Sequence, residues 1–180
     1  LYPYSEIPNF LDPFKENTLN EINLVKNILK LILSNSLNIN RRDLYWLSSG
    51  LELFYLNKFI DEYHSDLSMI GKFSNLFFIK NHNLSLMKFN NQFELGYKFV
   101  ASRNLNQKLS IPSNELTRVN YILSNPSKSL FSLKFLSSYI GKDNFNKSVL
   151  ELYNTDQPLG SLNQIKNIFE LNSSKDLKWF

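Results

Sequence analysis

The chain contains no cysteine and only two histidines among its 180 residues, and these absences exclude several kinds of site. Without cysteine there is no disulfide, no thiolate nucleophile, no cysteine-bound zinc and no iron–sulfur cluster. His64 and His82 are too few for a metal site built on several imidazoles. Glycine is scarce too, with five residues spread along the chain, so no glycine-rich phosphate loop is present.

Long apolar runs and concentrated positive charge are also missing. No apolar run approaches the roughly 18 residues that cross a bilayer, so the sequence predicts no transmembrane segment. The formal charge is +4, and Arg41-Arg42 is the only adjacent basic pair. Nucleic-acid binders usually gather their charge in a patch or stripe. Only the pI of 9.1 favours that function, and we expect no nucleic-acid partner.

The residues that are present supply enough apolar surface for one packed body. Hydrophobic residues make up 43% of the chain and aromatic residues 14%, which is too apolar for a disordered tail.

The 25 asparagines and the single alanine, Ala101, are the bias expected of an AT-rich genome. The chain begins with Leu1, and its first residues do not show the charged region followed by an apolar run that is typical of a signal peptide. We therefore expect a mature or trimmed product, or a part of a longer polypeptide.

The apolar periodicity predicts a mostly α, compact multi-helix domain over residues 17–180, preceded by an extended arm over residues 1–16. Pro3, Pro8 and Pro13 remove backbone donors from that arm and favour extended backbone. Steps of three and four residues between apolar side chains are typical of amphipathic helices. On this basis we expect helices over residues 17–34, 43–64, 67–80, 93–103, 113–123, 127–139, 144–153, 162–169 and 175–180, with residues 84–90 extended or irregular.

Three glycines carry more specific predictions. Gly50 lies inside the second expected helix, where it costs about 1 kcal/mol relative to Ala, so it indicates that another element packs closely there. Gly141 follows an expected helix and is suited to its C-terminal cap. Gly160-Ser161 precedes the helix over residues 162–169 in the manner of an N-cap. No strand–turn–strand signal such as Asn-Gly occurs.

Three segments of the chain follow the order of segments in a known enzyme family. Residues 45–52 read Tyr-Trp-Leu-Ser-Ser-Gly-Leu-Glu, residues 139–145 read Tyr-Ile-Gly-Lys-Asp-Asn-Phe, and residues 173–180 read Ser-Ser-Lys-Asp-Leu-Lys-Trp-Phe. They resemble the Trp-Leu-Asn-Glu-Gly, Leu-Gly-x-x-x-Phe and Ser-Gly-Lys-Asp-Leu-x-Trp-Phe segments of the aminopeptidase-N (gluzincin) zinc metallopeptidases. The resemblance implies the helical, C-terminal half of such a catalytic domain over residues 20–180.

In that family a His-Glu-x-x-His helix and a Glu on the next helix hold zinc, and the first Glu acts as general base on the zinc-bound water. We align the chain to this pattern through Trp46 and Gly50. The positions of the two histidines, the base and the third ligand then fall on Lys26, Lys30, Asn27 and Ser49, in that order. A family Tyr that steadies the tetrahedral intermediate aligns near residues 125–128, which contain Ser127 and no Tyr, although Tyr121 is near in the chain.

The resemblance therefore implies a zinc site that has been lost. Lysine binds a metal only when deprotonated, against an ordinary pKa of about 10.4. Lys26 and Lys30 could equally form the solvated face of their helix or fill an old cleft, and both interpretations stay open. Asp43, Glu52 and Glu62 are further candidates for an acid–base pair, although any helical protein of this size offers such carboxylates.

From this resemblance we expect a catalytically inactive metallopeptidase-like domain, a pseudo-peptidase, with no cofactor and no bound metal. It would act as a protein-binding scaffold, or as a subunit of a larger assembly, with other protein subunits as partners and a membrane-associated complex as one candidate. The composition and family variant resemble those of Bacteroidota, which favours the cell envelope, either periplasm or outer surface. The alternative is an active zinc aminopeptidase, or a part of one, whose metal ligands lie elsewhere. A scaffold should expose clustered aromatic residues, and the candidates are residues 2–4 and 73–78.

Overall fold

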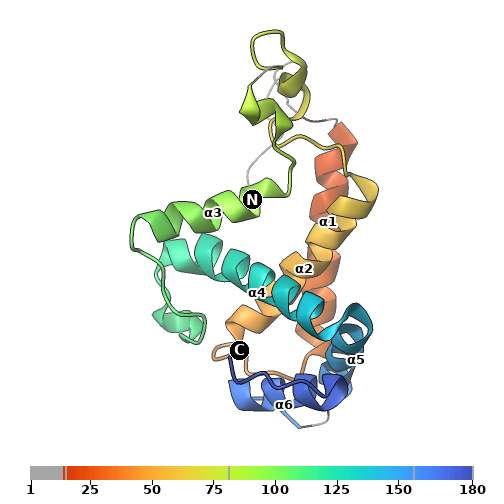
Figure 1. Ribbon diagram of the computed structural model, residues 1–180, viewed down its shortest axis with the longest axis vertical. Helices are drawn as coiled ribbons and strands as arrows, with labels where there is room; N and C mark the ends of the chain where they lie inside the picture. Colours follow the sequence, from red (N-terminus) through yellow and green to blue (C-terminus); the bar gives the residue numbers. More distant parts are fainter. Residues whose placement is uncertain (1–13, 15, 81, 156, 180) are drawn as a thin grey trace.

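Helices dominate the part of the chain that the computed structural model describes, which is residue 14 and residues 16–80, 82–155 and 157–179 (Figure 1). The α-helices of this part are α1 (Glu16–Ser36), α2 (Tyr45–Tyr63), α3 (Asn91–Ser102), α4 (Asn125–Ile140), α5 (Lys142–Tyr153) and α6 (Leu162–Ser173). Between these residues there are two isolated β-bridges and no strand. The prediction of a mostly α, multi-helix domain is confirmed. The predicted arm, residues 1–16, falls almost entirely outside the described residues.

Short helices of other types connect the α-helices. Three are 3₁₀-helices, η2 (Gly71–Asn75), η3 (Asn83–Leu86) and η4 (Ser113–Glu115), and η5 (Asn120–Ser124) is a π-helix that runs directly into α4. The predicted α-helix over residues 113–123 is therefore wrong in type and is broken in the middle. None of the helices within the described ranges is long and apolar enough to cross a bilayer.

Helices α2 and α4 cross at the centre of the molecule (Figure 1). Gly50 of α2 makes this approach possible, because a Cβ atom there would lie 2.7 Å from Ser129 Cβ of α4 and 3.3 Å from the Ser129 carbonyl carbon. The close packing predicted from Gly50 is thus confirmed. Fully buried leucines surround the crossing on both helices, namely Leu47, Leu51, Leu130, Leu133 and Leu136. This contact is the framework to which the other helices are attached.

Helices α5 and α6 close one end of the molecule around two buried phenylalanines, Phe145 and Phe169, whose ring centroids are 5.6 Å apart. Gly141 ends α4 with a φ of 91°, a backbone conformation that L side chains rarely adopt, as its predicted role as a cap requires. Ser161 begins α6 with a capping box to Gln164, which confirms the predicted N-cap.

The predicted helix over residues 175–180 is wrong. Ser174 stops α6 in the left-handed conformation with a φ of 53°, and the next described residues, 175–179, are not helical. The chain turns back onto the body instead, where Leu177 is fully buried and its N–H donates to the Glu170 carboxylate over 2.7 Å.

Helix α1 packs against α2 through one face only. Ile22 and Leu33 are buried on that face. Four large aliphatic residues on the opposite side are exposed, and we call them the α1 stripe: Leu24, Ile28, Leu31 and Ile32. At 3.6 residues per turn the stripe covers a sector of about 100°. The periodicity of residues 17–34 predicted a helix that buries one apolar face. The observed helix is apolar on two sides, and Ile28 and Ile32 lie on the side that is exposed to solvent.

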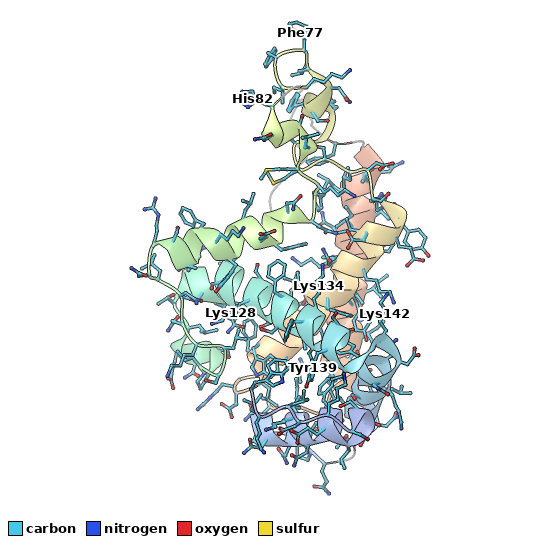
Figure 2. All side chains as sticks on the ribbon, viewed as in Figure 1. Phe77, His82, Lys128, Lys134, Tyr139 and Lys142 are labelled. Atoms are coloured by element: carbon cyan, nitrogen blue, oxygen red, sulfur yellow. The ribbon has the colours of Figure 1, made fainter. Side chains whose placement is uncertain are left out.

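Residues 67–89, which we call the lobe, project beyond the helices at one end of the longest axis (Figures 1 and 2). The lobe is closed at its base by two backbone hydrogen bonds. Met69 N–H donates to the Met87 carbonyl and Phe89 N–H donates to the Leu67 carbonyl, each over 2.8 Å. The predicted α-helix over residues 67–80 is wrong, because Gly71 adopts a φ of 55° and short turns replace the helix. The irregular structure predicted for residues 84–90 agrees with the short η3 helix and the turn that follows it.

Candidate functional site

The first candidate site is the region where the resemblance places a zinc ion. Lys26 and Lys30 lie one turn apart on α1 and are exposed, and they face the Glu52 carboxyl of α2 closely enough to influence its titration. Burial raises the pKa of Glu52 above its ordinary value, and the positive charges of Lys26 and Lys30 partly oppose that rise. The two lysines are thus both solvent-exposed and directed toward a carboxylate on the neighbouring helix.

Tyr45 at the start of α2 and Tyr121 of η5 extend this cluster. Tyr45 stacks on Tyr121 of η5 with ring centroids 4.5 Å apart, and its hydroxyl donates to the Tyr121 carbonyl over 2.9 Å. Burial raises the pKa of Tyr45 above its ordinary range, and the neighbouring Tyr121 and Glu52 add to that rise. Ser49 is buried one turn further on, and its hydroxyl donates to the Tyr45 carbonyl over 2.8 Å. The side chain of Ser49 is therefore engaged by its own helix.

The remaining aligned positions add no metal ligand to this cluster. Asn27 is exposed on α1. Ser127 is buried in α4 and faces α3, with its hydroxyl 3.9 Å from where a Cβ of Gly96 would stand. Within the described ranges, no three or more histidine or acidic side chains lie together in a way that could hold a metal ion. The arrangement offers paired lysines, one carboxyl and two tyrosines, which suit ion pairing and hydrogen bonding.

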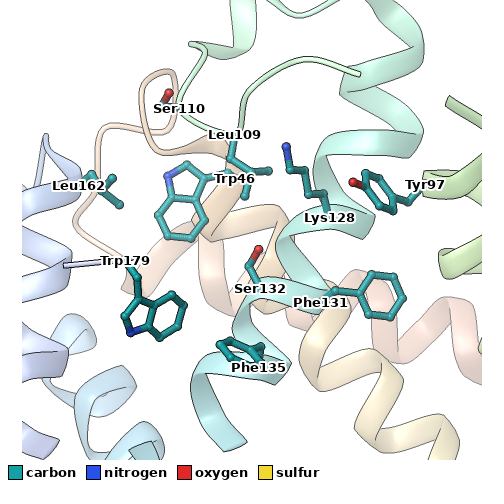
Figure 3. A pocket seen from close by; sticks show the side chains of 10 residues that line it. All are labelled: Trp46, Tyr97, Leu109, Ser110, Lys128, Phe131, Ser132, Phe135, Leu162 and Trp179. Atoms are coloured by element: carbon teal, nitrogen blue, oxygen red, sulfur yellow. The ribbon is translucent and has the colours of Figure 1, made fainter. Parts of the chain in front are cut away.

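The second candidate site is an open cavity of about 560 Å³ beside α4. Figure 3 shows the ten side chains that line it, which come from α2, α3, α4, the start of α6, the connection between α3 and η4, and the segment after α6. They are Trp46, Tyr97, Leu109, Ser110, Lys128, Phe131, Ser132, Phe135, Leu162 and Trp179. We call this cavity the aromatic pocket. Its volume lies within the range of about 300–1,000 Å³ that is usual for ligand sites.

Exposed aromatic rings form one rim of the aromatic pocket. Trp179 meets Phe135 edge to face at 5.1 Å between ring centroids and Tyr139 at 5.4 Å. Phe135 and Trp179 are 59% and 50% exposed, although both are large and apolar. Lys175 fixes this rim from outside, because its ammonium donates to the Tyr139 carbonyl over 2.6 Å and lies 4.6 Å from the centre of the Tyr139 ring.

The polar groups of the aromatic pocket are few. Lys128 is its single charged residue and extends from α4 on the same side as Tyr97 (Figures 2 and 3). The Ser110 and Ser132 hydroxyls are the other polar groups apart from the indole and phenol ends. A cavity with apolar walls and a single cation is suited to an apolar side chain that is accompanied by a carboxylate.

Trp46, which served only to align the chain with the gluzincin pattern, is buried in the core and also lines the aromatic pocket. The pocket itself was missed. Its residues come from positions as distant as 46, 97, 131 and 179, and no local pattern links them. The pairing of Tyr45 with Tyr121 was missed for the same reason.

Comparison of the chain with known protein families, curated proteins and solved structures found no match. The relation to the gluzincins therefore stays a prediction that depends on the three segments described above.

Proposed function

We propose that the chain is a catalytically inactive, metallopeptidase-like domain that binds other proteins, as a scaffold or as a subunit of a larger assembly. The aromatic pocket with its exposed rim is the observation that carries this proposal. Aromatic side chains held in a fixed arrangement around a cavity are the usual anchors of protein interfaces. The partner would insert an apolar side chain between Phe135 and Trp179 and would place a carboxylate near Lys128.

The cluster on α1 and α2 supports the inactive half of the proposal. Lys26 and Lys30 stand at the positions that the resemblance assigns to zinc-binding histidines, and both influence the Glu52 carboxyl. Two ammonium groups beside one carboxylate leave no net negative charge to attract a dication. We extend the proposal to a location in the cell envelope, within an assembly that is associated with the membrane, in an organism of the Bacteroidota. That extension depends on the resemblance and the composition.

Both tryptophans of the chain, Trp46 and Trp179, line the aromatic pocket, so intrinsic fluorescence reports its occupancy directly. The test begins with selection of peptides from a displayed random library on the immobilised chain, followed by fluorescence titration of the enriched peptides. We expect enriched peptides to combine aromatic or aliphatic residues with Asp or Glu. Binding should change the tryptophan emission. Phe135→Ser should weaken the affinity for the enriched peptides by more than about tenfold.

Two variants complete the design. Lys128→Gln should weaken binding less than Phe135→Ser does, and should remove the preference for acidic peptides. Leu171→Ser is the matched control, because Leu171 is 78% exposed on α6 and does not line the pocket. Peptides that bind equally well to Phe135→Ser and to the unchanged chain would contradict the proposal.

The alternative, an active zinc aminopeptidase, is tested separately. Elemental mass spectrometry of the unchelated protein should find zinc well below one atom per chain. Aminoacyl-4-nitroanilides should not be hydrolysed above the rate of a sample treated with chelator. One zinc per chain together with chelator-sensitive hydrolysis would show that the chain is an active zinc enzyme. This conclusion would hold whether or not the peptides bind.

A further inference from the structure

The lobe has a one-sided charge. Residues 67–93 contain Lys72, Lys80 and Lys88 and no Asp or Glu, although acidic residues make up 16 of the 180 positions in the chain. Asp66 and Glu94 flank the segment, next to the base of the lobe and not within it. A segment of this length that carries only positive charge is complementary to an anionic surface.

The lobe also exposes several large apolar side chains. Phe77 is 92% exposed and Phe78 is 73% exposed, and Leu76 and Leu86 are exposed beside them. Phe77 lies at the outermost end of the molecule along its longest axis, away from the helices (Figure 2). These side chains can therefore enter a flat surface before any other part of the described chain meets it. The exposure predicted for the aromatics of residues 73–78 is confirmed at these two positions.

Hydrogen bonds within the lobe hold the phenylalanines in this position. The N–H groups of Ile79 and Lys80 both donate to the Leu76 carbonyl over 2.8 Å, so Phe77 and Phe78 occupy the outside of a closed turn. The Ser85 hydroxyl lies within hydrogen-bonding distance of two carbonyls that follow this turn in the chain, those of Lys80 at 2.9 Å and His82 at 2.7 Å. The two backbone bonds at the base complete the closure. The aromatic tip is thus pre-organised for contact and pays little conformational entropy on binding.

We propose that the lobe is a membrane-contact element that inserts Phe77 and Phe78 into the interface of an anionic lipid bilayer. Phenylalanine side chains enter the boundary between headgroups and acyl chains, and lysines around them attract anionic headgroups. The separation of roles fits this surface, because Phe77 lies at the tip, whereas Lys80 ends the turn that carries it and Lys88 is bridged to Ser68 at the base, and both lysines are exposed. The inference goes beyond the proposed function, since it concerns the opposite end of the molecule from α6 and does not depend on the aromatic pocket.

The test is flotation of the full chain with vesicles of phosphatidylcholine alone and of phosphatidylcholine mixed with phosphatidylglycerol. We expect binding to the mixed vesicles and little binding to phosphatidylcholine alone. The double variant Phe77→Ser/Phe78→Ser should lower the partition coefficient by more than about tenfold. Lys80→Gln and Lys88→Gln should each lower it by about fivefold, an effect that added salt should diminish.

A tryptophan placed at the tip distinguishes insertion from surface adsorption. Phe77→Trp should bind like the unchanged chain, and its emission should shift to shorter wavelength and be quenched by lipids brominated on the acyl chains. Leu171→Ser, a change of an exposed apolar residue on α6, should bind as the unchanged chain does. Circular dichroism and urea unfolding of each variant identify any loss of fold.

Two results would overturn the proposal. One is a folded chain that does not float with vesicles of either composition, which is also the result expected if the lobe contacts a protein and not a lipid. The other is vesicle binding that Phe77→Ser/Phe78→Ser leaves unchanged, because lipid contact would then occur through another surface.

Discussion

Replacement of Gly50 by alanine tests the helix crossing on which the whole arrangement depends. The new Cβ would lie 2.7 Å from Ser129 Cβ, 3.0 Å from Leu133 Cδ1 and 3.3 Å from the Ser129 carbonyl carbon. Comfortable contact between carbon atoms requires about 3.5–4.0 Å. The Leu133 methyl can rotate away, but the Ser129 atoms move only if α4 moves.

Two opposing contributions set the size of the effect. Alanine in place of glycine inside a helix gains about 1 kcal/mol. Overpacking in a closely packed core costs about 1–3 kcal/mol, and contact with main-chain atoms places this site near the upper end. We therefore expect Gly50→Ala to lower the free energy of unfolding by about 2 kcal/mol. For a domain of this size the midpoint of thermal unfolding should fall by about 4–8 °C.

Gly96 offers a matched control in α3. A Cβ there would meet its nearest neighbours, Leu123 Cδ2 and Ser127 Oγ, at 3.8 and 3.9 Å, which is ordinary contact. Gly96→Ala should therefore raise the free energy of unfolding by up to about 1 kcal/mol, opposite in sign to Gly50→Ala. Urea unfolding followed by far-ultraviolet circular dichroism measures both changes.

A double-mutant cycle assigns the cost of Gly50→Ala to one neighbour. Ser129→Gly removes the closest atom, so Gly50→Ala should be less destabilising in that background by at least about 1 kcal/mol. If Gly50→Ala stabilises the protein as Gly96→Ala does, or if the cycle shows no coupling, then α2 and α4 do not approach as described.

Two further predictions concern α1 and α2. Because burial raises the pKa of Glu52, the folded state binds its proton more tightly than the unfolded state does, and the stability contributed by this group falls as the pH rises through its titration. Glu52→Gln should therefore be more stable than the unchanged chain near pH 8 and similar to it below about pH 4. Urea unfolding across that range measures the difference. A variant that is less stable than the unchanged chain near pH 8 would contradict this reasoning. Leu31→Gln, at a position 61% exposed on the α1 stripe, should change the free energy of unfolding by less than about 0.5 kcal/mol, whereas Leu33→Ala, at a buried position two residues further along, should cost about 2–5 kcal/mol. Equal effects of the two changes would mean that α1 packs through a different face.

The sequence predicted the helices most accurately where apolar residues recurred at helical steps over several turns. Residues 17–34 and 43–64 match α1 and α2 to within about two residues at each end, the usual uncertainty of helix ends. The failures at residues 67–80 and 175–180 have a common cause. Residues 67–80 and 175–180 contain apolar residues at plausible spacing, but nothing buries them in a helix. In the lobe Leu76, Phe77, Phe78 and Leu86 are exposed, and among residues 175–179 only Leu177 is buried in the core.

The sites were less accessible to prediction than the fold. Lys26 and Lys30 could be placed on one helix face by their spacing, but their relation to Glu52 depends on how α1 packs on α2, which no local pattern specifies. The aromatic pocket required six separate parts of the chain to be brought together. Only the exposure of aromatics in residues 73–78 could be anticipated, because the chain has more phenylalanine and tyrosine than one small core easily absorbs.

The hydrogen bonds at the base of the lobe mean that the chain leaves the helical body and returns to it at almost the same point. Residues 67 and 89 are paired across that base, so everything between them is an excursion that the connection from α2 to α3 does not require. Such a segment can open, shorten or exchange its tip while the helical core stays intact. Replacement of the lobe by a short turn at its base should therefore leave the helical body folded. The lobe itself could be grafted between two antiparallel backbone segments of another protein.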